Sequence, residues 1–220
     1  MNKKAAAHMP SGIAVVPAKA RLSIRDAQKQ MTRERLLDSA LELFEELGFR
    51  GVTIDKIMKH AQANRATFYL HFKDKLDIAW ALGQRQCGAE HTSLFQELDK
   101  LESPTPEDVL NWVRRRVALS TANPTLIHVM NEAVTSEPHF AAEYGAYLGR
   151  VAERVMVRTL GRREGRDHEL ARSKFIQLVM MMDRYVLYAE HHQLGFLGGC
   201  AVEAIAEMLW DALFRDLGPA

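Results

Sequence analysis

The 220-residue chain has few of the residues that interrupt or cross-link a fold. It contains only 7 prolines, 13 glycines and 2 cysteines. The cysteines, Cys87 and Cys200, lie far apart, and neither belongs to a CxxC pair. A disulfide scaffold and a cysteine-rich metal site are therefore not expected, and a reducing cytoplasm suits the composition. The scarcity of proline and glycine favours long regular elements.

The chain also lacks an apolar run long enough to cross a membrane. The richest stretch, Phe175–Met182, is broken by Gln177 and followed at once by Asp183. The alanine-rich start of the chain is interrupted by Pro10 and Gly12, which breaks the apolar core that a signal peptide needs. We therefore expect a cytoplasmic protein without a membrane partner.

Positive and negative charges nearly balance over the whole chain, but they are unevenly distributed along it. The net charge is only +1, yet residues 1–35 carry eight Lys and Arg against two acidic residues, which is +6. Residues 50–75 come to +4, and residues 76–220 come to −5. This asymmetry indicates either a polyanionic partner for the first third of the chain or a merely solvated basic tail.

Hydrophobic periodicity predicts an all-α fold of nine helices without strands. Residues 1–22 show little periodicity and are expected to form a disordered basic arm. The predicted helices cover approximately residues 23–48, 53–60, 64–70, 74–101, 107–121, 124–135, 138–160, 168–192 and 200–217.

Two short helices near the N-terminus have the spacing of a helix-turn-helix motif. Thr53 and Asn64 are good N-caps, and residues 61–63 between the helices are too few for anything but a tight turn. Arg65 and Thr67 would then lie near the start of the second helix, where base-reading residues usually lie. Many helical proteins contain such a pair, so spacing alone does not establish DNA binding.

Residue identities over Arg33–Ala81 resemble the DNA-binding segment of TetR-type transcriptional regulators. The matching pieces are A-x-x-L-F-x-x-x-G-F at Ala40–Phe49, V-T-I-D-K-I at Val52–Ile57 and T-F-Y-x-H-F-x-D-K at Thr67–Lys75. The family usually has Ala-Gly in the turn, where this chain has Gln62 as the second residue. If Gln62 must adopt a positive φ, it does so at a cost of about 1 kcal/mol relative to glycine.

The resemblance implies an N-terminal three-helix helix-turn-helix domain over residues 23–75. It also implies a C-terminal six-helix ligand-binding and dimerisation domain over residues 76–220. The implied partners are double-stranded DNA with a palindromic operator, a second copy of the chain and a small-molecule effector, with no cofactor and no metal. The family changes conformation when ligand binds, and the helix that begins after Asp74 would act as the lever.

The resemblance also implies roles for residues of the reader. Tyr69 and His71 would reach phosphates from the end of the recognition helix, and Phe68 and Phe72 would be core. Basic residues recur at four-residue steps and form one stripe: Arg21, Arg25, Lys29 and Arg33. This stripe would lie along the DNA backbone, enter a minor groove or only make the chain more soluble. The residues expected to contact DNA are Thr53, Asn64, Arg65, Thr67, Tyr69, His71 and Lys75.

Two further sets of residues are expected in the C-terminal part. Ordinary core is the alternative for both sets. The residues expected to line an effector pocket are Trp112, Arg116, His128, Met130, Tyr144, Tyr147, Met181, Asp183 and Tyr185. The residues expected at a dimer interface, on one face of the last two helices, are Phe175, Leu178, Met182, Val202, Ile205, Leu209 and Leu213.

The sequence thus predicts a dimeric DNA-binding regulator, a repressor released from its operator by a small, largely apolar ligand. One alternative is a helix-turn-helix module that organises the nucleoid or binds proteins without switching. The other is a helical-bundle enzyme, but the chain has no glycine-rich phosphate loop, no HExxH and no inward Glu/ExxH set. We therefore expect no enzymatic activity.

Overall fold

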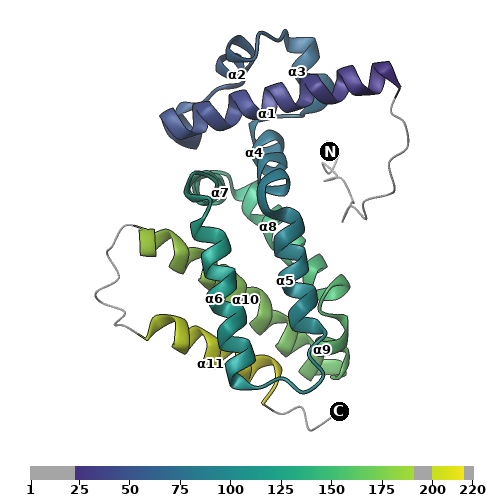
Figure 1. Ribbon diagram of the computed structural model, residues 1–220, viewed down its shortest axis with the longest axis vertical. Coiled ribbons are helices and arrows are strands. Elements are labelled where there is room, and N and C mark those ends of the chain that lie inside the picture. Colours follow the sequence, from purple (N-terminus) through teal and green to yellow (C-terminus); the bar gives the residue numbers. More distant parts are fainter. Residues whose placement is uncertain (1–22, 191–199, 216–220) are drawn as a thin grey trace, which may run out of the picture.

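The computed structural model describes residues 23–190 and 200–215 (Figure 1). These residues form eleven α-helices and one π-helical turn and contain no strand, which confirms the predicted all-α class. The expected basic arm, residues 1–22, lies outside the described residues. None of the helices in the described part is long and apolar enough to cross a membrane.

A small N-terminal unit stands above a larger helical bundle, and α4 connects the two (Figure 1). The elements of the N-terminal part are α1 (Ile24–Gly51), α2 (Ile54–His60), α3 (Arg65–His71) and α4 (Lys75–Gly83). The elements that follow are η1 (Gln84–Gly88), α5 (Ala89–Asp99), α6 (Pro106–Thr121), α7 (Pro124–Ser136), α8 (Pro138–Arg154), α9 (Val157–Gly161), α10 (Gly165–Glu190) and α11 (Ala201–Leu213).

Side-chain caps begin the short N-terminal helices where the sequence predicts them. Thr53, Asn64 and Asp74 each accept a hydrogen bond from the backbone N–H three residues later, at 3.2, 2.8 and 2.8 Å. Each bond satisfies a helix-terminal donor that would otherwise lack an intrahelical partner. Gly48, the predicted end of the first helix, interrupts the helical geometry of α1 with φ 66 and ψ 171.

Two predicted helices are divided in the structure. The predicted helix over residues 74–101 changes into the π-turn η1 between α4 and α5. The predicted helix over residues 138–160 breaks at Val155 and Met156, both of which are buried. Asp99, which is only 7% exposed, accepts hydrogen bonds from the backbone N–H groups of Arg158 and Thr159 at 3.1 and 2.8 Å. This carboxylate from a distant helix stabilises a new helix start, α9.

Two apolar clusters make up the core. One joins α1–α4 to α7 and α8, and it includes Leu126, Val129 and Phe140. The other holds the C-terminal bundle together and includes Phe95, Trp112 and residues of α10 and α11. The N-terminal unit is therefore packed onto α7 as well as attached through α4.

Candidate DNA-binding surface and ligand cavity

Helices α2 and α3 lie on the side of α1 that faces away from the large bundle (Figure 1). Phe68 and Phe72 are 0% and 2% exposed, and their ring centroids lie 5.9 Å apart. These two side chains are core, as predicted. Because they fix the inner face of α3, the opposite face of this helix points to solvent.

Arg65 and Tyr69 form the centre of that outer face. The Arg65 guanidinium carbon lies 5.9 Å from the Tyr69 ring centroid, and one of its nitrogens lies 3.7 Å from a carboxylate oxygen of Asp55. The Arg65 and Asp55 side chains are 68% and 74% exposed, and Tyr69 is 46% exposed. An exposed ion pair of this kind contributes little stability, so Arg65 can leave Asp55 for a nucleic-acid acceptor.

The polar residues at the two helix starts already have local partners. The Asn64 side-chain carbonyl accepts from the Thr67 backbone N–H at 2.8 Å and from the Thr67 hydroxyl at 2.9 Å. The Thr53 hydroxyl oxygen accepts from the Lys56 backbone N–H at 3.2 Å. For contact with DNA, Asn64 therefore offers its NH₂ group and Thr53 its hydroxyl hydrogen.

His71 lies where the end of α3 meets the first half of α1. Partial burial lowers the pKa of His71, and the positive charges of Lys29 and Arg33 lower it further. The Arg33 guanidinium carbon lies 5.1 Å from the ring centroid of Phe72. The structure thus places part of the predicted basic stripe beside the recognition helix, while Arg21 lies outside the described residues.

Lys75 does not point outward in this structure, and its expected role as a phosphate anchor stays a prediction. Its ammonium group donates to the backbone carbonyls of Phe49 and Val52 at 2.7 and 3.0 Å and lies 4.0 Å from the Phe49 ring centroid. Burial lowers the pKa of Lys75. The lysine joins the start of α4 to the end of α1 because unpaired carbonyls at that helix end need donors.

The turn between α2 and α3 places Gln62 at the positive φ that the family pattern suggests. Gln62 has φ 50, a left-handed conformation that favours glycine. The Gln62 N–H donates to Lys59 O at 3.3 Å, and the Ala63 N–H donates to Met58 O at 2.9 Å. These two bonds form a Schellman motif, so Gln62 takes the place that glycine normally occupies at the end of a helix.

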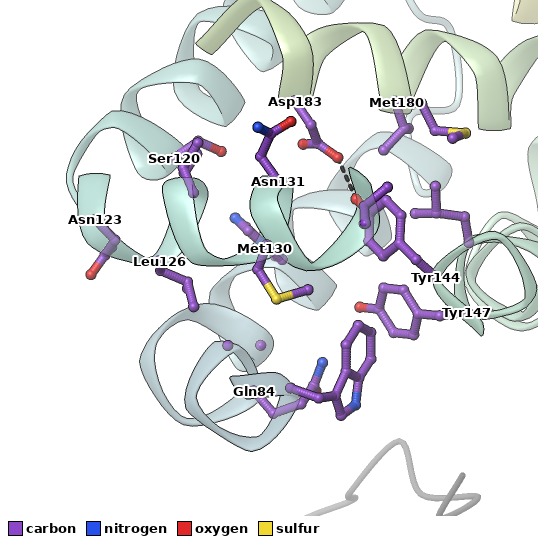
Figure 2. Close-up of a pocket in the computed structure, with 18 of the residues that line it drawn as sticks. Gln84, Ser120, Asn123, Leu126, Met130, Asn131, Tyr144, Tyr147, Met180 and Asp183 are labelled. Atoms are coloured by element: carbon purple, nitrogen blue, oxygen red, sulfur yellow. Dashed lines mark hydrogen bonds between the residues drawn. The ribbon is translucent and has the colours of Figure 1, made fainter. Parts of the chain in front are cut away.

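A cavity of about 180 Å³ lies below the N-terminal unit, among α4, η1, α5, α6, α7, α8 and α10. Figure 2 shows side chains from several of these helices around one space, with Gln84, Met130 and Tyr147 among them. Its walls are mainly apolar and aromatic, with a few polar groups. This combination is typical of a small-molecule site.

The polar groups of the cavity centre on Arg116, which is 4% exposed. One guanidinium nitrogen lies 2.6 Å from an Asp183 carboxylate oxygen, and another donates to the Ser120 hydroxyl. The Tyr144 hydroxyl donates to the second Asp183 oxygen (Figure 2). Burial and the negative charge of Asp183 raise the pKa of Tyr144, so its hydroxyl remains a donor.

Two buried nitrogens of the cavity residues have no hydrogen-bond partner among the described residues, the Nε2 of His91 and the Nε of Arg116. Burial lowers the pKa of His91 to about 3, and the nearby charge of Arg116 adds to the shift. His91 is therefore neutral at physiological pH. Unpaired buried polar atoms are rare, and they indicate a group that the protein itself does not supply.

Five of the nine predicted pocket residues line the cavity: Arg116, Met130, Tyr144, Tyr147 and Asp183. The other four, Trp112, His128, Met181 and Tyr185, are not among the residues that line this cavity, and their assignment to an effector pocket stays a prediction. Trp112 is buried in the C-terminal core and donates its indole N–H to Leu94 O at 2.7 Å, while Met181 is 36% exposed.

Several lining residues were not predicted, among them Trp80, Gln84 and His91. None of these three residues has a role predicted from the sequence. A histidine and a glutamine on the inner side of a predicted helix were the available signal, because buried polar side chains need a partner.

The predicted dimer residues lie mostly in the protomer's own core, which contradicts their assignment to an interface. Phe175, Met182, Leu209 and Leu213 are 0% exposed, and Ile205 is 4% exposed. Leu178 and Val202 are partly buried against the same core. These faces of α10 and α11 are apolar because they pack against the bundle, which was the alternative for this set.

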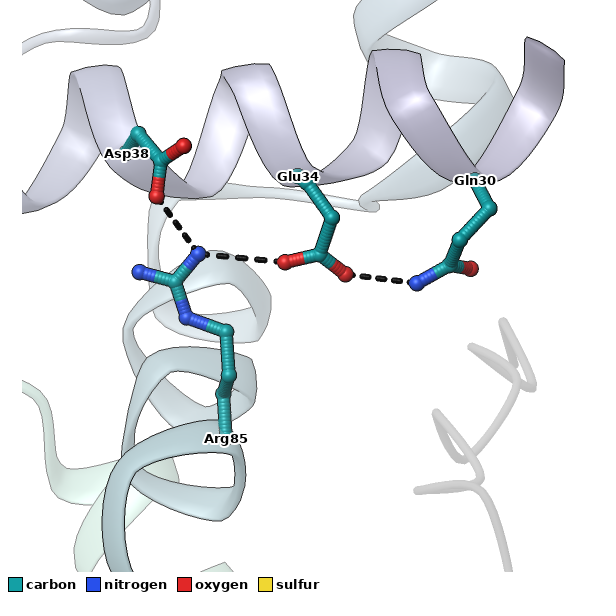
Figure 3. Close-up of polar contacts among 4 residues, drawn as sticks. All are labelled: Gln30, Glu34, Asp38 and Arg85. Carbon is teal, nitrogen blue, oxygen red and sulfur yellow. Dashed lines mark hydrogen bonds and ion pairs between the residues drawn. The ribbon is translucent and has the colours of Figure 1, made fainter. Parts of the chain in front are cut away.

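Polar contacts join α1 to two elements that also line the cavity, η1 and α7. On η1, Gln84 lines the cavity, and one nitrogen of the adjacent Arg85 lies 2.7 Å from Asp38 and 3.1 Å from Glu34, both on α1. Gln30 extends this chain by donating to Glu34 at 2.5 Å (Figure 3). On α7, Met130 and Asn131 line the cavity, and the Glu132 carboxylate accepts from the Arg50 backbone N–H at 3.1 Å.

Comparison with known proteins supports the sequence-based resemblance. Residues 36–82 match the family described as bacterial regulatory proteins, tetR family. The regulator AcrR of Shigella flexneri is 33% identical over 114 residues, which cover 50% of this chain and 45% of AcrR. The match thus spans less than half the length of this relative. The family and the relative are described as transcriptional regulators, in line with the expectation that the chain is not an enzyme.

Two solved structures share the fold over most of the chain. A putative TetR-family transcriptional regulator from Mesorhizobium loti has a TM-score of 0.54 at 16% identity and covers 84% of this chain and 97% of its own. The fatty acid degradation regulator FadR from Bacillus halodurans has a TM-score of 0.52 at 18% identity, with coverage of 86% and 97%. The N-terminal segment, residues 36–82, thus carries the domain of the tetR family of bacterial regulatory proteins that the sequence resembles.

Proposed function

We propose that the chain is a transcriptional repressor that binds a palindromic operator as a homodimer and releases it when a small, largely apolar ligand enters the cavity. One observation carries the proposal: η1 and α7 each line the cavity on one side and contact the DNA-binding unit on the other. A ligand that moves η1 or α7 would change the contacts that hold α1 in place.

The proposed DNA contacts divide by chemistry. Arg65 and Tyr69, on the exposed face of α3, would reach base edges and phosphates in the major groove. Thr53, Asn64, Thr67 and His71 surround them and would contact phosphates. Lys29 and Arg33 extend the basic surface beyond α3, where they would add contacts that do not depend on sequence.

The proposed dimer contact uses the outward sides of α10 and α11 instead of their core faces. Met181 on α10 and Met208 on α11 are 36% and 43% exposed. Flexible methionine side chains adapt well to an apolar contact. A two-fold dimer would present two α3 helices, one to each half of a palindrome.

A gel-shift titration with DNA from upstream of the gene tests the proposal. We expect specific affinity to exceed affinity for unrelated DNA by about 10³ or more at physiological salt. A double variant, Arg65→Ala with Tyr69→Ala, should lose this preference while remaining folded by circular dichroism. The matched control is Arg115→Ala, since Arg115 pairs with Glu97 between α5 and α6, away from α3.

Two outcomes would contradict the proposal. A ratio of specific to non-specific affinity near one would leave a helix-turn-helix protein that organises DNA without reading its sequence. Specific binding that survives the double variant would move the recognition surface away from α3.

A further inference from the structure

We propose that the cavity is built for an uncharged aromatic molecule that carries a hydroxyl group, a ligand of the phenol class. The inference rests on the proposed function, because it names the effector of the same cavity. Four features of the cavity carry it: its size, the rings in its wall, the compensation of its charges and its two unpaired nitrogens.

The cavity volume sets the size of the ligand. One water needs about 10–15 Å³ of such a volume, so the cavity of about 180 Å³ holds on the order of 12 to 18 waters. An organic ligand that replaces them has a similar number of non-hydrogen atoms. This corresponds to about two fused rings with a substituent.

The aromatic wall favours a ring as the body of the ligand. Trp80 and Tyr147 meet edge to face, with ring centroids 4.8 Å apart, and Tyr144 lies 6.4 Å from Tyr147 (Figure 2). Phe95, Leu126 and Met130 complete the apolar lining. A planar aromatic body gains from offset and edge contacts with such rings as well as from burial.

The charges of the cavity favour an uncharged ligand. The Arg116 guanidinium already has a carboxylate partner in Asp183 at 2.6 Å, and the second Asp183 oxygen has the Tyr144 hydroxyl. A ligand carboxylate would compete with Asp183 for Arg116 and would face the negative charge of Asp183 at close range. Repulsion of this kind is stronger in a partly buried site than between charges in bulk water. The third charged lining residue, Arg184, is exposed.

The unpaired nitrogens select the polar group. Arg116 Nε–H can only donate, whereas Nε2 of a neutral His91 accepts when the proton is on Nδ1. We expect the hydroxyl of a bound ligand to accept a hydrogen bond from Arg116 and to donate one to His91. A methyl ether can accept a hydrogen bond from Arg116 but cannot donate one to His91. An unsubstituted ring can form neither hydrogen bond.

Isothermal titration calorimetry with a matched series tests the proposal: 2-naphthol, 2-methoxynaphthalene and 2-naphthoate. We expect 2-naphthol to bind wild-type protein at least ~10-fold more tightly than either of the others, because each loses a hydrogen bond or adds a charge. In His91→Phe, 2-naphthol should lose most of its advantage over the ether, since neither then has an acceptor at that position.

Asp183→Asn separates the charge argument from general damage to the cavity. In this variant an NH₂ group of similar size replaces one carboxylate oxygen. Arg116 therefore loses its compensating charge. We expect 2-naphthoate to gain at least ~10-fold in affinity and 2-naphthol to change by less than about 3-fold. Glu97→Gln is the control, because Glu97 pairs with Arg115 and does not line the cavity, and it should leave the selectivity unchanged.

Three results would overturn the proposal. The first is tighter binding of 2-naphthoate than of 2-naphthol to the wild type. The second is equal binding of all three compounds, and the third is no binding of any of them. A gel shift without added compound separates this failure from failure of the proposed function, because specific operator binding would persist when only the ligand class is wrong.

Discussion

Gln62 stands in a left-handed turn where glycine has no steric penalty, since its φ is 50. We expect Gln62→Gly to raise the free energy of unfolding by up to about 1 kcal/mol, because relief at positive φ is partly offset by the larger entropy of glycine in the unfolded chain. Gln62→Val should lower it by more than 1 kcal/mol, since a β-branched residue tolerates this conformation poorly. Urea denaturation measures both. Equal stability of the three proteins would mean that the turn relaxes to another geometry.

His91 makes stability depend on pH. In the unfolded chain it takes up a proton near its ordinary pKa of 6.5, whereas burial keeps the folded pKa at about 3. Between these values the unfolded state binds more protons, so the free energy of unfolding must fall as the pH falls through that window. From pH 7 to pH 5 this group contributes a loss of up to about 2 kcal/mol.

His91→Phe is the variant that isolates this contribution. We expect its free energy of unfolding, measured by urea denaturation at pH 7 and pH 5, to fall less than that of the wild type. Contributions from the rest of the chain are common to both proteins and cancel in the comparison. Parallel losses in the two proteins would show that His91 is already solvated in the folded state.

At the scale of elements, the contact between η1 and α1 is the most direct link between cavity and reader. Arg85 is its centre, with ion pairs at 2.7 Å to Asp38 and 3.1 Å to Glu34. We expect Arg85→Met to weaken operator binding by about 3- to 30-fold, the range of 0.5–2 kcal/mol that single residues contribute to such coupling. Affinity for 2-naphthol should change by less than about 2-fold, because Arg85 does not line the cavity.

Arg115→Met provides the matched control for this experiment, since it removes an exposed arginine pair within the bundle, at 2.6 Å between Arg115 and Glu97. Fluorescence anisotropy with labelled operator DNA gives the affinities. If both variants bind the operator as tightly as the wild type, the orientation of α1 is maintained without Arg85, by α7 with its Glu132 and by the apolar core that α1 shares with α4, α7 and α8.

Local chemistry explains which elements the sequence predicts well. Thr53, Asn64 and Asp74 act within three residues of their own position, so their caps are visible in the sequence. The start of α9 depends on Asp99, which is about 60 residues away in the chain, so no local pattern reveals it. The π-turn η1 likewise has no distinct signal, because π-turns occur within ordinary helical sequence.

The site was predicted unevenly for a similar reason. Arg65 and Tyr69 follow from helical phase and the family pattern, and the structure places both on the exposed face of α3. An apolar helix face, in contrast, looks the same whether it packs on the bundle, lines a cavity or meets a second copy. Phe175 and Leu209 were therefore assigned to a partner although they are fully buried in the protomer.

At the scale of the whole molecule, the remaining exposed apolar side chains of α10 and α11 bear on assembly. We expect a double variant, Met181→Asp with Met208→Asp, to shift the protein from dimer to monomer, because two buried charges without partners disfavour an interface. Sedimentation velocity at micromolar concentration measures this. The control is Val157→Asp on α9, a residue that is 55% exposed. A dimer that persists in the double variant would place the contact elsewhere.

Ligand and operator must oppose each other by the same factor if they compete through conformation. The cavity and α3 lie in different parts of the molecule (Figure 1), so a ligand cannot displace DNA by direct contact. Thermodynamic linkage then requires that, if 2-naphthol weakens operator binding by a given factor, the operator weakens 2-naphthol binding by that same factor. We expect a factor of about 5 to 150, which is usual for such coupling.

Calorimetry of 2-naphthol with and without saturating operator measures how much the operator weakens 2-naphthol binding. Anisotropy of labelled operator with and without 2-naphthol measures how much 2-naphthol weakens operator binding. Arg85→Met should reduce both factors together, because it removes the ion pairs that connect η1 to α1. Unequal factors would show that 2-naphthol also binds outside the cavity, and a factor of one would separate the cavity from the control of DNA binding.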